Sequence, residues 1–127
     1  MTASKARPDV RLKRAYEEPA PEDGLRILVD RLWPRGVRKA DAAIDRWEKD
    51  LAPSTPLRQW FGHEPQRWEE FRRRYLLELQ PQAALLGELR ELARTTRVTL
   101  VYAAHDQEHN DAVVLRELLL GPPGARR

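Results

Sequence analysis

The chain has 127 residues, of which 41% are hydrophobic and 34% are charged, and it contains no cysteine. This length predicts one globular domain, and the lack of cysteine excludes disulfides, thiol nucleophiles and cysteine-ligated metal or iron–sulfur sites. The net charge of +3 arises at the ends, because residues 1–14 carry +4, Arg126 and Arg127 add +2, and residues 15–125 sum to −3. Overall charge is therefore weak evidence for a nucleic-acid partner.

The ends of the chain carry no targeting or membrane signal. No apolar run approaches the roughly 18 residues of a membrane helix, and the N-terminus lacks the hydrophobic segment of a signal peptide. We therefore expect a cytoplasmic protein with no membrane partner. Residues 10–120 are expected to form the single domain, with flexible ends at 1–9 and 121–127.

The first third of the chain predicts two strands. Residues 10–16 alternate apolar and basic side chains, which is typical of a strand exposed on one face. Residues 25–30 contain an apolar run of the length and composition of a strand buried on both faces. Since the connection between them is short and rich in proline, a hairpin is the simplest pairing.

Helices dominate the middle of the chain. Apolar residues at helical spacing predict a helix over 39–51, with a short strand over 44–47 as the alternative. Thr55 and Pro56 predict the cap and the first position of the next helix. Further helices are expected from Pro65 to about Gln80 and then between Pro81 and Thr95.

The last third contains the second strand that reads as buried on both faces, residues 98–104, followed by a polar loop and a helix over 112–120. Asn110 or Asp106 is suited to cap that helix. Two buried strands separated by helices predict a right-handed parallel crossover. The expected fold is a small layered α/β single domain, with a central, mostly parallel sheet of few strands flanked by helices.

Both buried strands should end at the same edge of the sheet, which brings the loops 30–36 and 105–110 side by side. In the resulting pocket Arg31 and Arg35 are suited to hold an anion, because guanidinium groups match carboxylates and phosphates. The walls of the pocket would be formed by Trp33, Arg58, Trp60 and His63. The groups suited to orient or transfer protons are Asp30, Asp106 and His109. Alternatively, Arg31 pairs with a structural carboxylate, Trp33 plugs the edge of the core, and His63 is an ordinary loop residue.

The polar loop also permits a metal-site interpretation, because its imidazole and carboxylate side chains are of the kind that bind zinc, manganese or iron. These side chains belong to His105, Asp106, Glu108, His109 and Asp111. The spacing of the two histidines aligns them only on a helix, and a loop that caps the last helix explains the segment as well, so we predict no metal. No phosphate-binding glycine-rich loop or dinucleotide motif occurs, and no cofactor is expected.

Three long stretches of the sequence, ILVDRLWPRG, WEKDLAPSTPLRQWFGHEP with WEEFRRRYLLEL, and VTLVYAAHDQEHNDAVVL, resemble the YeaO-like family of small bacterial proteins, within a larger domain family of unknown function. The resemblance covers roughly residues 10–120 and implies a compact α/β fold in a bacterial cytoplasmic protein. It implies no reaction.

The resemblance adds candidate ligand-binding residues. These are Lys49, Ser54 and Asn110. The other matched motif positions not yet named, which are not candidates for the site, are Pro34, Gly36, Trp47, Pro53, Leu57, Phe61 and Ala112. For Ser54 a turn or cap role is the simplest account. His105 stands where relatives are expected to have lysine, which weakens a catalytic role for it. Longer relatives carry a Cys-His-Arg motif, and its thiol chemistry does not transfer to a chain without cysteine.

The sequence thus predicts a pocket for a small anionic ligand, such as a phosphate ester, a nucleotide or a carboxylate. It leaves open whether the chain is an enzyme; hydrolysis or group transfer without a cofactor is the reaction class that fits. The alternatives are a nucleic-acid-binding or regulatory protein that uses Arg11, Lys13 and Arg14, and a non-catalytic interaction module. The sequence does not indicate the oligomeric state.

Overall fold

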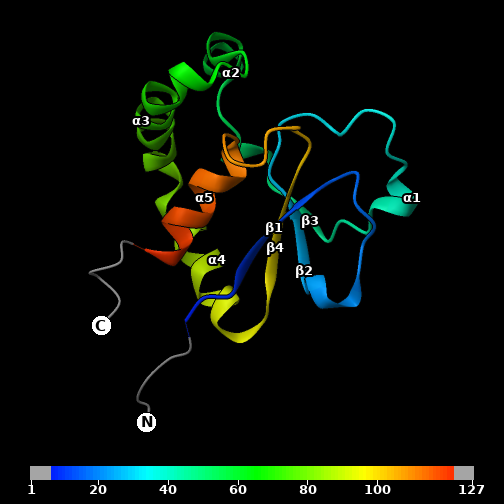
Figure 1. Cartoon of the computed structure of the whole chain (residues 1–127). Helices are drawn as coiled ribbons and strands as arrows, with labels where there is room; N and C mark the ends of the chain where they lie inside the picture. The colour runs from blue at the N-terminus through cyan, green and yellow to red at the C-terminus, as the bar shows by residue number, and fades with distance from the viewer. Residues whose placement is uncertain (1–6, 122–127) are drawn as a thin grey trace.

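The structure is a computed structural model, and it describes residues 7–121. Four strands form one parallel sheet: β1 (Val10–Arg14), β2 (Leu25–Leu28), β3 (Arg46–Trp47) and β4 (Val98–Tyr102). Their order is β1-β4-β2-β3. The helices α2 to α5 gather on one side of this sheet, and the short α1 (Lys39–Ala42) lies on the other (Figure 1). The predicted α/β class with a parallel sheet is confirmed.

Strand β4 is the centre of the sheet. All five of its residues are buried, and it pairs with β1 through Val10 and Val98 and with β2 through Leu25 and Val98. A strand this apolar needs neighbours on both edges and cover on both faces. The predicted hairpin between the first two strands is therefore wrong, because residues 15–24 carry the chain back so that β2 runs parallel to β1 with β4 between them.

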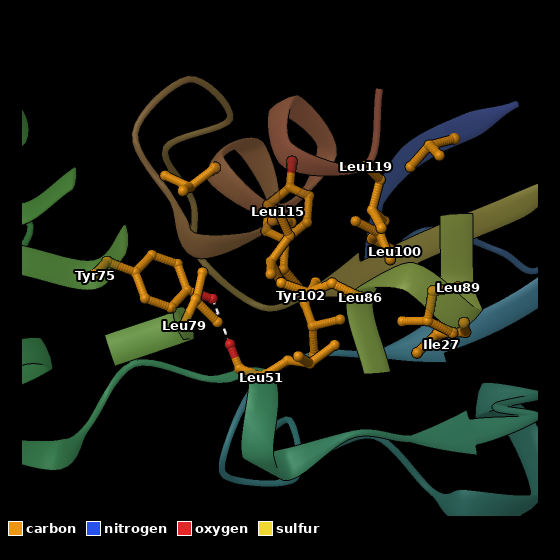
Figure 2. Close-up of a cluster of buried hydrophobic side chains, with 14 of the residues drawn as sticks. Ile27, Leu51, Tyr75, Leu79, Leu86, Leu89, Leu100, Tyr102, Leu115 and Leu119 are labelled. Carbon is orange, nitrogen blue, oxygen red and sulfur yellow. Dashed lines mark hydrogen bonds between the residues drawn. The ribbon is translucent and has the colours of Figure 1, made fainter. Parts of the chain in front are cut away.

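The helices that cover the sheet are α2 (Thr55–Phe61), α3 (Trp68–Leu79), α4 (Ala83–Thr95) and α5 (Asp111–Leu120). Helix α5 packs on β1 and β4 and against α4. Figure 2 shows the core between these layers, where the Tyr75 hydroxyl donates a hydrogen bond to the Leu51 carbonyl. This bond satisfies the polar end of a side chain that is otherwise fully buried among leucines.

The predicted helix over 39–51 is wrong, and the alternative short strand is correct. Helix α1 ends after one turn because Ala43 takes a left-handed conformation with φ of 53°. The chain then extends along the open edge of β2, where Asp45 N–H donates to the Arg26 carbonyl and Asp45 Oδ2 accepts the Arg26 N–H at 2.8 Å. The backbone N–H and C=O groups at that edge of β2 need hydrogen-bond partners, and this need favours a strand here although the apolar residues have helical spacing.

The cap of α2 lies one residue earlier than predicted. Ser54 Oγ accepts the Leu57 N–H at 3.2 Å, so Ser54 is the N-cap and Thr55 the first helical residue. Both residues carry a hydroxyl, and the sequence alone did not distinguish them. Of the two caps predicted for the last helix, Asn110 and Asp106, the structure has Asn110, whose side chain accepts the Val113 N–H at 3.0 Å.

Most of the expected flexible ends, 1–9 and 121–127, lies outside the described residues. Of the part within them, Pro8 is buried, and Asp9 accepts hydrogen bonds from Arg11 and Arg97. Among residues 7–121 no helix has both the length and the apolar character needed to cross a membrane.

Candidate functional site: a cleft at the strand ends

A cleft of about 1190 Å³ opens at the carboxyl ends of β1, β2 and β4. In a parallel sheet the loops that follow neighbouring strands meet at one edge, and this is where ligand crevices form. The predicted juxtaposition of the two loops is confirmed, because Ala103 N–H after β4 donates to Asp30 Oδ2 after β2 at 2.9 Å. The loop before α5 and the C-terminal end of α2 complete the walls.

We call this hollow the strand-end cleft. Its lining includes nine residues predicted for the site: Asp30, Arg31, Trp33, Arg35, Arg58, His63, Asp106, His109 and Asn110. Three predicted residues lie elsewhere. Lys49 Nζ sits 4.1 Å from the centre of the Trp47 ring, Ser54 caps α2 and donates to Glu78, and Trp60 packs under the guanidinium groups of Arg67 and Arg74.

Two of the four arginines of the cleft are held by backbone carbonyls. Arg31 donates to Pro53 O at 3.4 Å and to Ala52 O at 3.3 Å, which ties the loop after β2 to the segment before α2. Arg14 donates to Ala104 O at 2.9 Å and to Ala103 O at 3.3 Å. Both side chains therefore shape the cleft by fixing its loops.

The other two arginines, Arg35 and Arg58, are exposed and form no ion pair with a carboxylate within residues 7–121. Arg58 is near enough to Asp30 for its charge to favour the ionised form of that carboxyl. Two guanidinium groups that form no salt bridge within residues 7–121, in one concave surface, are suited to bind an anion.

The side chains of Asp30 and Asp111 both line the cleft and lie near enough to affect each other's ionisation. Burial raises the pKa of Asp30, and burial together with the negative charge of Asp30 raises the pKa of Asp111 well above its ordinary value. Two interacting carboxyl groups repel each other when both are ionised, and this repulsion favours the protonated form of one of them. Ala112 N–H also donates to Asp111 Oδ1 at 2.9 Å, which fixes the pair at the start of α5.

Asp111 was considered from the sequence only as a possible metal ligand, and its interaction with Asp30 was not predicted. Asp30 is 81 positions away in the chain, and the two residues meet because both lie at the cleft, Asp30 after β2 and Asp111 at the start of α5. The one signal in the sequence was an acid directly after the capping residue Asn110, in the loop expected to face the other strand end.

The Asp106–His109 pair is formed within one loop. Asp106 Oδ1 accepts the N–H groups of Glu108 and His109, and Asp106 Oδ2 lies 2.8 Å from His109 Nδ1. These backbone N–H groups, chiefly that of Glu108, and the His109 ring lower the pKa of Asp106. The other side of the His109 ring meets Trp68 edge to face at 5.2 Å. Asp106 thus orients the imidazole at the wall of the cleft, as an acid–base pair requires.

The rim of the cleft is apolar. Leu32 is 62% exposed and Tyr16 is 49% exposed, and both line the opening. The Tyr16 hydroxyl donates to the Arg35 carbonyl at 3.0 Å, and Trp33 Nε1 donates to the Val37 carbonyl at 2.6 Å. These bonds hold the loop after β2 in place, so Arg35 is presented from a braced loop.

Metal binding has little support from the geometry. In the part of the chain that the structure describes, no three histidine, aspartate or glutamate side chains converge in a way that could hold an ion. The group of loop residues considered as ligands is divided: Asp111 faces Asp30, and Asp106 faces His109.

A substitution tests whether Asp30 and Asp111 hold a proton between them in the folded protein. Asp111→Asn replaces the protonated carboxyl by an amide that still donates to Asp30, and it removes one buried charge site. We expect it to raise the free energy of unfolding at pH 7 by about 1 kcal/mol. Because folding raises both carboxyl pKa values, the stability that their protonation contributes is complete below the ordinary aspartate pKa of 3.8 and is lost as pH rises.

The advantage of Asp111→Asn over wild type should therefore grow with pH above 3.8, as measured by urea unfolding across a pH series. Asp50→Asn, at an exposed position outside the cleft, is the matched control and should change stability by less than about 0.5 kcal/mol. A loss of stability in Asp111→Asn at neutral pH would show that no proton is shared.

A family model described as the inactive DUF488-N3 subclade matches residues 9–124. The uncharacterized protein Rv3073c of Mycobacterium tuberculosis H37Rv is 48% identical over 112 residues, which are 88% of this chain and 94% of that protein. The uncharacterized protein YeaO of Escherichia coli K12 is 41% identical over 111 residues, which are 87% of this chain and 96% of YeaO. No solved structure matches the chain significantly.

Proposed function

The chain belongs to the inactive DUF488-N3 subclade, and on that premise we propose that it binds a small anionic ligand in the strand-end cleft without turning it over. The sequence matches confirm the resemblance to the YeaO-like family. The ligand class is a phosphate ester, a nucleotide or a carboxylate, and the place of action is the cytoplasm. The family description, which calls the subclade inactive, favours binding over the hydrolase or transferase alternative.

One observation carries the proposal: Arg35 and Arg58 line a single cleft and form no salt bridge within residues 7–121, and only Arg58 feels a nearby carboxyl, that of Asp30. An arginine that serves only the fold is normally bound to carbonyls or carboxylates, as Arg14 and Arg31 are here. The apolar rim at Leu32 and Trp33 offers contact area for the rest of the ligand.

The nucleic-acid alternative has less support, because the basic residues of β1 are engaged within the fold. Arg11 pairs with Asp9 at 3.0 Å, and Lys13 pairs with Asp23 at 3.0 Å. A second hollow of about 430 Å³ beside β1 has these basic residues in its wall, and their charge is already neutralised there. A basic surface for phosphates requires cations that are free to neutralise them.

A thermal-shift experiment tests the proposal. Wild type is heated with phosphate, phenylphosphonate, adenosine monophosphate or benzoate at constant ionic strength. A ligand at 100 times its dissociation constant adds about 2.7 kcal/mol, which raises the melting temperature by several degrees. Arg35→Ala and Arg58→Ala should each weaken the binding by about tenfold or more, because a charged hydrogen bond contributes about 1.5–3 kcal/mol.

Arg38→Ala is the matched control, since Arg38 lies just beyond the same loop and pairs with Asp41 at the exposed surface. It should leave the shift unchanged. The proposal fails if no anion stabilises wild type, or if the stabilisation persists in the Arg35→Ala/Arg58→Ala double variant. Salt-sensitive binding to DNA or RNA in place of any shift would favour the nucleic-acid alternative.

A further inference from the structure

The opening of the strand-end cleft carries exposed apolar side chains beside a cation. Within residues 7–121 the large apolar side chains that are strongly exposed are Tyr16, Leu32 and Leu77, at 49%, 62% and 53%. Tyr16 and Leu32 both line the cleft, whereas Leu77 lies on α3 outside it. A single exposed leucine needs no explanation, but apolar side chains that gather at the mouth of a cleft are typical of ligand-binding grooves.

This apolar rim, formed by Tyr16 and Leu32, adjoins one of the two arginines proposed to bind the anion. The Tyr16 hydroxyl donates to the Arg35 carbonyl at 3.0 Å, and Leu32 lies three residues before Arg35 on the same loop. The Arg14 guanidinium lies 5.1 Å from the centre of the Tyr16 ring, so the tyrosine is held at both its ring and its hydroxyl. An apolar surface and a guanidinium that forms no salt bridge within residues 7–121 therefore lie in one braced segment.

From this arrangement we infer that the ligand is an amphipathic anion. Its charged group binds the two arginines of the proposed function, and its aryl or alkyl group packs on Leu32 and Tyr16. The inference rests on the proposed function and narrows its ligand class. Apolar surface that is removed from water stabilises a complex in proportion to its area. A small hydrophilic anion, such as inorganic phosphate or a sugar phosphate, would leave the rim exposed and gain nothing from it.

The rim has no part in the packing of the fold. Within residues 7–121, neither Leu32 nor Tyr16 belongs to the hydrophobic core or packs against it, as the partly buried Leu12 and Leu25 do. The fold therefore gains little from an apolar side chain at position 32. A polar residue there should leave the midpoint of urea unfolding unchanged, which makes Leu32 a position where binding can be altered without loss of stability.

The experiment measures the affinity of the full chain for n-alkylphosphonates, from methyl to octyl, by isothermal titration calorimetry at constant ionic strength. Each methylene that packs on the rim should tighten binding to wild type by about two- to fourfold, until the chain extends past the rim. Phenylphosphonate and benzylphosphonate form a second arm, which shows whether the rim prefers a flat ring to a linear chain. A gain over methylphosphonate in either arm is the expected result.

Substitutions at Leu32 separate the rim from the anion site. Leu32→Ser should reduce the advantage of hexylphosphonate over methylphosphonate by about fivefold or more, because it removes most of the apolar contact, and it should leave the binding of methylphosphonate unchanged. Leu32→Met keeps an apolar side chain of similar size and should retain the advantage. Leu77→Ser is the matched control, since Leu77 is also an exposed leucine but lies outside the cleft, and it should behave as wild type.

Three outcomes overturn the inference. If all the phosphonates bind wild type equally and still require Arg35 and Arg58, the ligand is a simple anion, and the proposed function stands while this inference fails. If the advantage of the longer chain persists in Leu32→Ser, the apolar group packs elsewhere, for example on Phe61 and Phe71 in the wall of the cleft. If no phosphonate binds, the proposed function fails as well, and binding to phosphatidylcholine–phosphatidylglycerol vesicles would then assign the rim to a lipid surface.

Discussion

Replacing Asp23 by alanine is expected to lower the free energy of unfolding by about 3–5 kcal/mol, because it leaves a buried guanidinium without its counter-charge. Asp23 Oδ2 accepts Arg26 Nη1 at 2.7 Å, and the Asp23 and Arg26 side chains are only 10% and 4% exposed. Lys13 Nζ adds bonds of 3.0 and 3.1 Å. Without Asp23, Arg26 keeps only the carbonyls of Ala42 and Ala43.

The loss should depend on pH. Burial raises the pKa of Asp23, but the hydrogen bonds from Ala20 N–H, Lys13 and Arg26 outweigh it, and the net pKa is lowered. A lowered folded pKa gives stability that is present above the ordinary value of 3.8 and lost as pH falls through the folded pKa. The difference between wild type and Asp23→Ala should therefore shrink in acid below pH 3.8.

Urea unfolding measures this loss, and two further variants define its cause. Asp23→Asn keeps acceptors for Ala20 and Arg26 but not the charge, so it should lie between wild type and Asp23→Ala. Asp41→Ala removes a carboxylate whose pair with Arg38 is 65% and 78% exposed, and it should cost no more than about 1 kcal/mol. An Asp23→Ala variant as stable as Asp41→Ala would contradict the account.

The second large effect is expected at the neighbouring residue. Gly24→Ala should cost at least about 2 kcal/mol, because Gly24 has φ of 65° and a Cβ there would lie 2.3 Å from the Arg97 carbonyl oxygen. That oxygen cannot move freely, since it accepts the Leu25 N–H at 2.8 Å at the start of β2. The close approach of backbone to backbone requires glycine.

Thermal or urea unfolding of Gly24→Ala is best compared with Gly87→Ala. Gly87 lies within α4, and an added Cβ would meet nothing within 4 Å. That substitution should stabilise the protein by about 0.5–1 kcal/mol, as alanine is favoured over glycine in a helix interior. The two substitutions are thus expected to change stability in opposite directions. If both variants were equally stable, the close backbone approach described at Gly24 would be wrong.

These two residues matter for the cleft as well as for stability. Asp23 and Gly24 fix the turn that starts β2 beside β4, and Thr99 Oγ1 donates to the Asp23 carbonyl at 2.7 Å. The parallel order that follows sends the ends of β2 and β4 to the same edge. A hairpin, as the sequence suggested, would have directed β2 the other way and separated Asp30 from the loop after β4.

The sequence predicted the α/β class, the two buried strands and the meeting of their loops, because apolar runs and helical spacing are local signals. It could not predict the pairing order, since β1 and β2 are joined by a short loop that favours a hairpin until β4 is placed between them. The short strand β3 was predicted only as an alternative, because the spacing of Ile44, Trp47 and Leu51 fits a helix. It forms by pairing with β2, and a local pattern does not report that long-range pairing.

For the candidate site, residue type indicated which loops line the strand-end cleft but not the contacts of each side chain. Arg31 and Arg35 read alike in the sequence, yet Arg31 is bound to carbonyls and Arg35 is not. Lys49 belongs to a long motif and still points to Trp47. Asp111 acquires its role only through contact with Asp30, and no local pattern reports a contact of that kind.

The central claim is that the strand-end cleft binds small anions through Arg35 and Arg58. The most direct test is a titration of the full chain with phenylphosphonate, followed by the backbone amide resonances in NMR spectra. The account predicts saturable changes concentrated at Arg35, Arg58, Ala103 and Asp111. Changes centred instead on the hollow beside β1, at Leu12 and Thr99, or no saturable change at all, would contradict it.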